Sequence, residues 1–104
     1  MPAYKLSELA DEDILGIVRY TIQNFGMAQA RSYHTDLTRV LELLAQNPDL
    51  GSECDWICTG MRRFQFKKHG IYLMVLEEGI LVSRVLHHSI DIDAQDFPAL
   101  YNTL

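Results

Sequence analysis

The chain has 104 residues, of which 48% are apolar and 22% are charged, and its formal net charge is −5 at pH 7. This length predicts one domain over residues 1–104, and the composition excludes a disordered tail, a collagen-like repeat and a disulfide scaffold. The longest apolar run, residues 71–76, is far shorter than the roughly 20 residues that span a bilayer, and no apolar signal segment opens the chain. The two cysteines fit a reducing compartment. We therefore expect a cytoplasmic protein without membrane contact.

Charge is unevenly distributed along the chain. Residues 1–55 carry nine acidic and four basic side chains, residues 56–88 carry two acidic and five basic ones, and residues 89–104 add three aspartates. Phosphate neutralisation supplies most nucleic-acid affinity, so an acidic chain predicts no direct sequence-specific nucleic-acid binding. A basic segment within it predicts a local anionic partner. The alternative is that these bases only solvate one face of a sheet.

The first half of the chain predicts an edge strand followed by two helices. Residues 3–6 alternate weakly, Ser7 can cap the next helix, and Gly26 can end it in a left-handed conformation. Asn47 and Pro48 end the second helix, so the two helices form an antiparallel hairpin. Apolar residues recur at helical spacing in both: Ala10, Ile14, Ile17, Val18, Ile22 and Phe25 in the first, and Ala30, Tyr33, Leu37, Val40, Leu41 and Leu44 in the second.

The second half of the chain predicts antiparallel strands. Residues 56–59, 62–68, 71–76 and 80–87 have strand-like patterns, with turns at residues 69–70 and 77–79. The fold class is therefore α+β, with a helical hairpin packed on a three- to four-stranded antiparallel sheet. The folded core covers about residues 3–88. Residues 89–104 form either a short helix or a segment that awaits a partner.

The cysteines, histidines and acidic residues do not have the spacing of a known catalytic or metal-binding motif. Cys54 and Cys58 lack zinc or redox spacing, and neighbouring His87 and His88 on a strand point to opposite faces. No nucleophile elbow, phosphate loop or carboxylate pair is present, so we expect no catalytic residue, metal or cofactor. Arg84 stands inside an apolar strand and needs a partner or an open groove. The expected partner is Glu77, Asp91 or Asp93.

A combination of residues spread over the chain matches the sequence pattern of one protein family. The match runs from about residue 6 to residue 96. It is carried by Leu6, Ser7, Ala10, Asp13, Ile14, Ile17, Tyr20, Thr21, Phe25, Gly26, Gln29, Ala30, Tyr33, Leu37, Leu44, Asn47, Pro48, Gly51, Gly60, Arg62, Arg63, Phe64, His69, Gly70, Ile71, Tyr72, Arg84, Val85, Leu86, His87 and Asp91. In these positions the chain resembles the ParE toxins of the RelE/ParE toxin–antitoxin superfamily.

This resemblance implies a growth-inhibiting toxin that inhibits DNA gyrase by binding and is neutralised by a ParD-like antitoxin in a hetero-oligomer. The expected gyrase contacts are basic residues on or beside the sheet: Arg62, Arg63, Lys67, Lys68, Arg84 and His87. The expected antitoxin groove uses apolar residues of the helices: Leu9, Ile14, Val18, Ile22, Tyr33, Leu37 and Leu41. The opposing interpretation is that these seven residues belong to the core.

Two alternatives remain. The RelE branch of the superfamily cleaves mRNA on the ribosome, and His87, Arg62, Arg63 and Lys67 could serve as acid, base and phosphate ligands in such a reaction. The absence of arginine at the start of the strand over residues 71–76 and the acidic helices favour gyrase inhibition instead. The other alternative is a degenerate member that binds antitoxin without being toxic.

Overall fold

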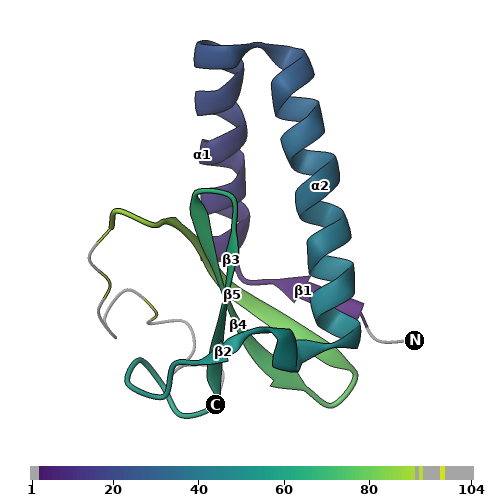
Figure 1. Cartoon of the computed structure of the whole chain (residues 1–104), viewed down its shortest axis with the longest axis vertical. Coiled ribbons are helices and arrows are strands. Elements are labelled where there is room, and N and C mark those ends of the chain that lie inside the picture. The colour runs from purple at the N-terminus through teal and green to yellow at the C-terminus, as the bar shows by residue number, and fades with distance from the viewer. Residues whose placement is uncertain (1–2, 91, 93–96, 98–104) are drawn as a thin grey trace.

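The computed structural model describes residues 3–90, 92 and 97, and it places a helical hairpin on a twisted sheet (Figure 1). The elements in chain order are β1 (Ala3–Leu6), α1 (Glu8–Phe25), α2 (Met27–Gln46), η1 (Pro48–Leu50), β2 (Ser52–Glu53), β3 (Met61–Phe66), β4 (His69–Leu76) and β5 (Gly79–His87). None of these helices is long and apolar enough to cross a bilayer within the described residues. The expected α+β fold class is confirmed.

The sheet has five strands in the order β1-β5-β4-β3-β2, which are the expected N-terminal edge strand and four antiparallel strands. β3, β4 and β5 form an antiparallel meander, and β1 pairs in parallel with the first half of β5, from Ala3–Gly79 to Leu6–Val82. A Cβ at Gly79, where φ is 150°, would fall on the Ala3 carbonyl oxygen, so this pairing requires glycine. Beyond Val82 no strand pairs with this edge of β5 among the described residues, and α1 contacts it instead.

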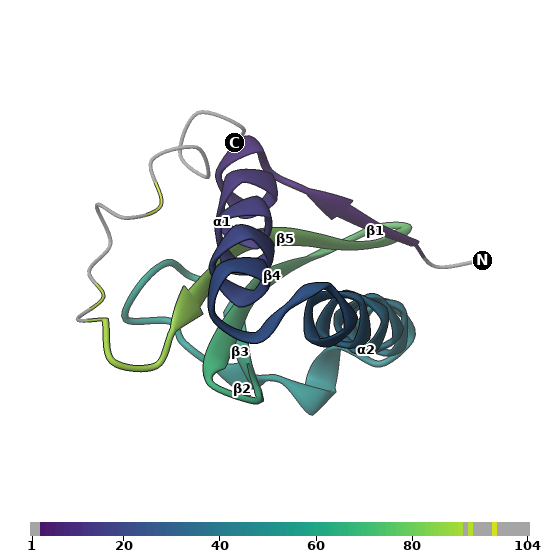
Figure 2. The ribbon, with the colours of Figure 1, turned by 90° about the horizontal axis from the view of Figure 1, so that it is seen from above.

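Both helices begin and end as the sequence signals predict. Ser7 accepts a hydrogen bond from the Ala10 amide at 3.0 Å, which satisfies one of the unpaired amides at the start of α1. Gly26 joins the helices with φ at 91°, a conformation that favours glycine. Viewed from above, α1 lies across β5 with α2 beside it (Figure 2). The upper half of the hairpin projects past the sheet (Figure 1).

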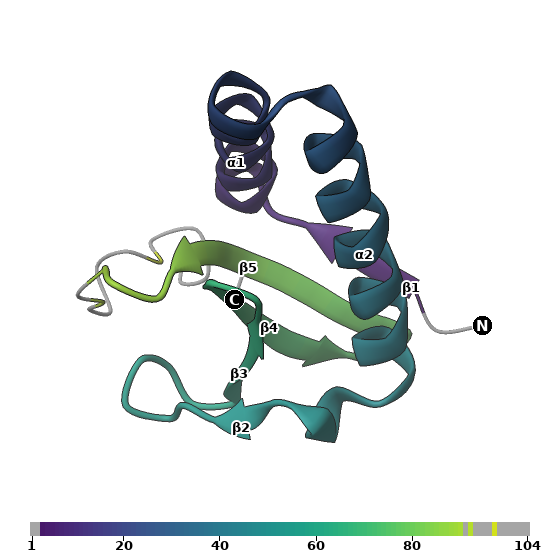
Figure 3. The ribbon, with the colours of Figure 1, turned by 45° about the horizontal axis from the view of Figure 1, so that its top comes forward.

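The buried residues form two clusters. They take alternate residues of β4, so they lie on opposite faces of the sheet, one of which is covered by the helical hairpin (Figure 3). The larger cluster lies between the hairpin and the sheet and includes Leu37, Leu44, Ile71 and Val85. The smaller one lies under the segment after β2 and joins Cys54, Ile57 and Met61 to strand residues and to Phe97. Because both faces are covered over its first half, β4 carries consecutive buried apolar residues at Ile71, Tyr72 and Leu73, as expected of a central strand, while Val75 and Leu76 near its end are exposed.

Two predicted local structures were wrong. Residues 56–59 form turns instead of a strand, and Trp56 is exposed, while the short strand beside β3 is β2, at Ser52–Glu53. The β3–β4 turn lies at Lys67 and Lys68, with Lys67 at φ 52°, and His69 and Gly70 belong to β4. Gly70 serves another purpose: a Cβ there would lie 2.8 Å from the Arg63 guanidinium, so its absence makes room for that side chain.

Candidate functional site

A cleft of about 700 Å³ opens between one face of α1, the start of α2, the β3–β4 turn and the end of β5. Apolar side chains make up much of its wall and basic side chains gather at the turn. The lining residues are Glu12, Asp13, Gly16, Ile17, Tyr20, Thr21, Phe25, Gln29, Tyr33, Lys67, Lys68, His69, Val85, Leu86, His87 and Ile90. The cleft therefore combines apolar and cationic surfaces, as expected of a binding site.

The α1 wall of the cleft is formed by residues three and four apart, which share one helical face. Tyr20 and Phe25 are 61% and 68% exposed, and their rings meet edge to face with centroids 6.5 Å apart. Phe25 belongs to the apolar pattern of α1 but lies where the hairpin has passed the end of the sheet. The sheet therefore does not cover these rings, and they remain available to a partner.

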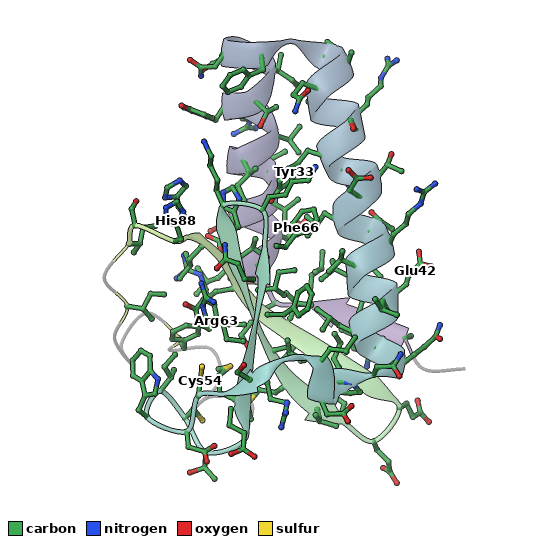
Figure 4. All side chains as sticks on the ribbon, in the orientation of Figure 1. Tyr33, Glu42, Cys54, Arg63, Phe66 and His88 are labelled. Carbon is green, nitrogen blue, oxygen red and sulfur yellow. The ribbon has the colours of Figure 1, made fainter. Side chains whose placement is uncertain are left out.

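The floor of the cleft is a cluster of Tyr33 and histidines. Tyr33 Oη and His69 Nδ1 are hydrogen-bonded at 3.1 Å, and the His69 and His87 rings meet edge to face at 5.5 Å. The ring centroids of Tyr33 and Phe66 are 5.3 Å apart, and Figure 4 shows these two residues one below the other between α1 and α2. His87 Nδ1 lies 2.7 Å from Ser89 Oγ. The sequence resemblance included Tyr33, His69 and His87 but did not indicate that they would meet.

Burial keeps Tyr33 and His69 uncharged near neutral pH. Loss of solvent raises the pKa of Tyr33 to about 12, so its phenol stays protonated. The pKa of His69 is lowered, first by burial and then by the nearby His87 and His88. The groups around this neutral centre include Glu12 and Asp13 from α1, and Lys67 and Lys68 from the turn.

Three of the six predicted target-binding residues meet at the cleft: Lys67, Lys68 and His87. Lys67 Nζ lies 3.0 Å from Asp36 Oδ2 and about 5.5 Å from the centre of the Tyr33 ring. Lys68 is exposed, and its ammonium has no ion-pair partner among the described residues. Its carbonyl oxygen accepts a 2.8 Å hydrogen bond from the His88 amide, which ties the turn to β5. These contacts give the cleft a fixed cationic end.

Arg84 is held beneath α1 by a carboxylate, as expected, but the partner in the structure is Asp13 from α1. Nε and Nη2 of Arg84 donate to Asp13 at 2.7 and 2.8 Å, and the Val85 amide donates to the same carboxylate at 3.1 Å. Asp13 thereby takes up a backbone amide on the part of β5 that β1 leaves uncovered. Of the expected partners, Asp91 and Asp93 lie outside the described residues.

Arg62 and Arg63 lie on β3, away from the cleft. Arg62 donates to the carbonyl oxygens of Pro48 and Gly51 at 3.1 and 3.0 Å and so anchors the turn after α2. Arg63 donates to Tyr72 Oη at 3.1 Å, with its guanidinium 5.6 Å from the ring centre. Figure 4 shows Arg63 well below Tyr33. Both arginines make contacts that stabilise the sheet.

The predicted antitoxin residues divide between core and surface. Ile14, Tyr33, Leu37 and Leu41 are buried in the larger core cluster, although Tyr33 also reaches the cleft floor. Leu9 and Val18 are half-buried, and Ile22 is exposed. The opposing interpretation thus holds for the four buried residues. The apolar surface at the cleft comes instead from Ile17, Tyr20, Phe25 and Ile90.

The two cysteines do not line the cleft. Within residues 3–90, 92 and 97, no group of three histidine, cysteine or acidic side chains is placed to hold a metal ion. Burial raises the pKa of the Cys54 thiol, which disfavours the reactive thiolate. Cys58 lies in the same cluster, on the face of the sheet away from the hairpin.

The lowered pKa of His69 predicts a pH-dependent stability. The unfolded chain takes up a proton at His69 near the usual pKa of 6.5, and the folded chain does so only at lower pH. Stability should therefore be constant above about pH 7 and fall as the pH drops below 6.5, because the unfolded state then binds more protons. Urea unfolding of the wild type and His69→Gln between about pH 5 and pH 8 measures this. Equal slopes for the two proteins would contradict the assignment.

Comparison with known proteins places this fold in a family. A family model described as "ParE toxin of type II toxin-antitoxin system, parDE" matches residues 4–92. Toxin ParE1 of Mycobacterium tuberculosis is 34% identical over 91 residues, covering 86% of this chain and 93% of that protein. Toxin ParE1 of Caulobacter vibrioides is 32% identical over 93 residues, covering 88% and 94%.

A solved structure agrees with the sequence comparisons. A chain from the chromosomal ParDE TA system of P. aeruginosa superposes with a TM-score of 0.70 at 18% identity, covering 84% of this chain and 96% of that one. The shared fold and the sequence relatives together confirm the resemblance stated from the residues. The chain belongs to the ParE toxin family of type II toxin–antitoxin systems.

Proposed function

We propose that this protein arrests growth by binding DNA gyrase without catalysing a reaction, and that a ParD-like antitoxin neutralises it by covering the cleft in a hetero-oligomer. The observation that carries the proposal is the cleft itself, in which exposed aromatic rings adjoin the cationic β3–β4 turn. Uncovered apolar surface of this kind favours a protein partner. The fold relative from a ParDE system supports an antitoxin as that partner.

Neutralisation follows if the antitoxin and the target need the same surface. We assign the target contact to Lys67, Lys68 and His87, which lie at the cationic end of the cleft. Arg62 and Arg63 are consecutive on β3, so their side chains point to opposite faces of the sheet, and gyrase would have to reach around this strand to contact both. Arg84 supports the contact indirectly by holding α1 on β5. An antitoxin seated in the cleft would then exclude gyrase by direct competition.

Ribosome-dependent mRNA cleavage is the second candidate, and the floor of the cleft is the observation in its favour. Tyr33, His69 and His87 are adjacent groups able to exchange protons, and two lysines lie beside them. However, a pKa of about 12 is far from the operating pH and makes the Tyr33 phenol a poor general acid or base, and Arg84 donates to Asp13. These contacts favour a binding surface over a phosphate-stabilising active site.

Growth of cells that express the chain tests the proposal. Induction of the wild-type chain alone should arrest growth, and co-expression of the polypeptide encoded by the adjacent reading frame should restore it. Lys68→Glu should reduce the arrest, while Lys5→Glu, which makes the same charge change on β1, should leave it intact. Normal growth on induction, with the protein folded and abundant, would contradict the proposal and favour the non-toxic alternative.

A further inference from the structure

Gly16 interrupts the middle of α1 for no reason that the fold supplies. Glycine within a helix is less favourable than alanine, so a glycine here lowers stability. Close packing does not require it, because a Cβ at this position would meet no atom within 4 Å. The backbone at Gly16 is helical, so its φ is not positive and does not require glycine. The missing side chain therefore leaves open space on the surface.

That open space lies within the cleft. Gly16 shares the cleft-facing side of α1 with Ile17 and Tyr20, and the exposed Phe25 lies further along the same helix. A large side chain arriving from outside would rest on the backbone at Gly16, with Ile17 and Tyr20 on one side and the acidic turn at residues 12–13 on the other. A side chain at position 16 would occupy that space first.

Charge around this gap is asymmetric. Lys67 and Lys68 stand at the turn, with Lys67 already paired with Asp36, and Glu12 stands on α1. A carboxylate of the partner placed near Lys68 would form an ion pair with it, and no described residue already pairs with this ammonium. A polyanion would meet Glu12 and a chain of net charge −5, so nucleic acid fits less well than a peptide with few charges.

We propose that the partner inserts one large apolar side chain into the gap above Gly16 and places a carboxylate at Lys68. The inference rests on the proposed function, since the partner is the antitoxin, and it names the chemistry by which the antitoxin is recognised. Glycine at position 16 thus lowers the stability of α1 but leaves a site in which a side chain of the partner can bind.

Substitutions at Gly16 distinguish its effect on stability from its effect on binding. Gly16→Ala and Gly16→Leu should both fold and should raise the thermal midpoint by about 2–6 °C, because both remove a helix glycine and the Cβ that they add meets no atom within 4 Å. Gly16→Leu should weaken binding of the polypeptide encoded by the adjacent reading frame by about 10- to 100-fold, the value of one buried apolar anchor. Gly16→Ala should have a smaller effect. Thr35→Leu, on an exposed part of α2, controls for an added leucine and should bind as the wild type does.

Calorimetric titration of the full chain with that polypeptide measures these affinities, and repeating it at two salt concentrations tests the carboxylate contact. Lys68→Glu should weaken binding and reduce its salt dependence. Wild-type affinity in a folded Gly16→Leu would overturn the inference while leaving the proposed function intact. Failure of the wild-type chain to bind the polypeptide would overturn both.

The gap above Gly16 could instead receive nucleic acid or a second copy of this chain, and each would give a distinct result. Titration with a 12-nucleotide single-stranded DNA and sedimentation of the chain alone should both give no binding that depends on Gly16. DNA binding that Gly16→Leu abolishes would assign the gap to nucleic acid. Self-association that Gly16→Leu abolishes would assign it to a second copy of the chain. Either result would overturn the proposed recognition.

Discussion

Replacing Asp13 by alanine should lower the free energy of unfolding by about 3 kcal/mol, since it leaves a largely buried guanidinium without this carboxylate. The Asp13 and Arg84 side chains are 13% and 18% exposed, and the carboxylate accepts hydrogen bonds from Arg84 and from the Val85 amide. The same substitution therefore leaves an amide of β5 unpaired. Total stabilities of small domains are about 5–15 kcal/mol, so this loss is a large fraction.

Glu12→Ala is the matched control for this experiment. It removes the same charge from the neighbouring position, but Glu12 is exposed and makes no ion pair within the described residues. Its effect should be within about 0.5 kcal/mol. Equilibrium urea unfolding of the two variants gives both values. Similar stabilities for Asp13→Ala and Glu12→Ala would show that the contact of α1 with β5 does not depend on the pair.

Leu37→Ala should lower the free energy of unfolding by about 2–5 kcal/mol, the usual range for a buried leucine replaced by alanine. Leu37 is 1% exposed and belongs to the cluster between the hairpin and the sheet. The substitution removes apolar contacts and leaves a cavity that rigid neighbours fill only in part. The same method measures it.

Leu43 provides the comparison on the same helix. It is 48% exposed, so Leu43→Ala should cost less than about 1 kcal/mol. The contrast also decides the role of Leu37, which the sequence pattern alone could not assign to the core or to an antitoxin groove. Equal losses at the two positions would contradict the burial of Leu37 and reopen it as a partner contact.

Local patterns predicted the hairpin and the meander because their causes are local. Ser7, Gly26 and Pro48 act on their own neighbours, and helical spacing determines which side of each helix is apolar. The same spacing could not tell Phe25 from Leu37. Both fit the pattern, but burial depends on where the sheet ends, and the hairpin projects past that end.

Contacts between distant segments account for the remaining differences. Glycine after His69 suggested a turn, but Gly70 accommodates the Arg63 guanidinium, and the turn forms at Lys67 despite its unfavourable positive φ. The expected partners of Arg84 lie close to it in sequence, and only the packing of α1 against β5 reveals Asp13, 71 residues earlier, as the actual one. The cleft joins parts of α1 and α2 to residues 67–69 and 85–87, so no short motif encodes it.

Supercoiling by purified DNA gyrase tests the central claim that this toxin acts by binding a protein target. The wild-type chain should inhibit the reaction in proportion to its concentration, and Lys68→Glu should require more protein for the same inhibition. Prior addition of the polypeptide from the adjacent reading frame should abolish inhibition. In parallel, mRNA on translating ribosomes should stay intact. Cleaved mRNA together with unaffected supercoiling would contradict the account.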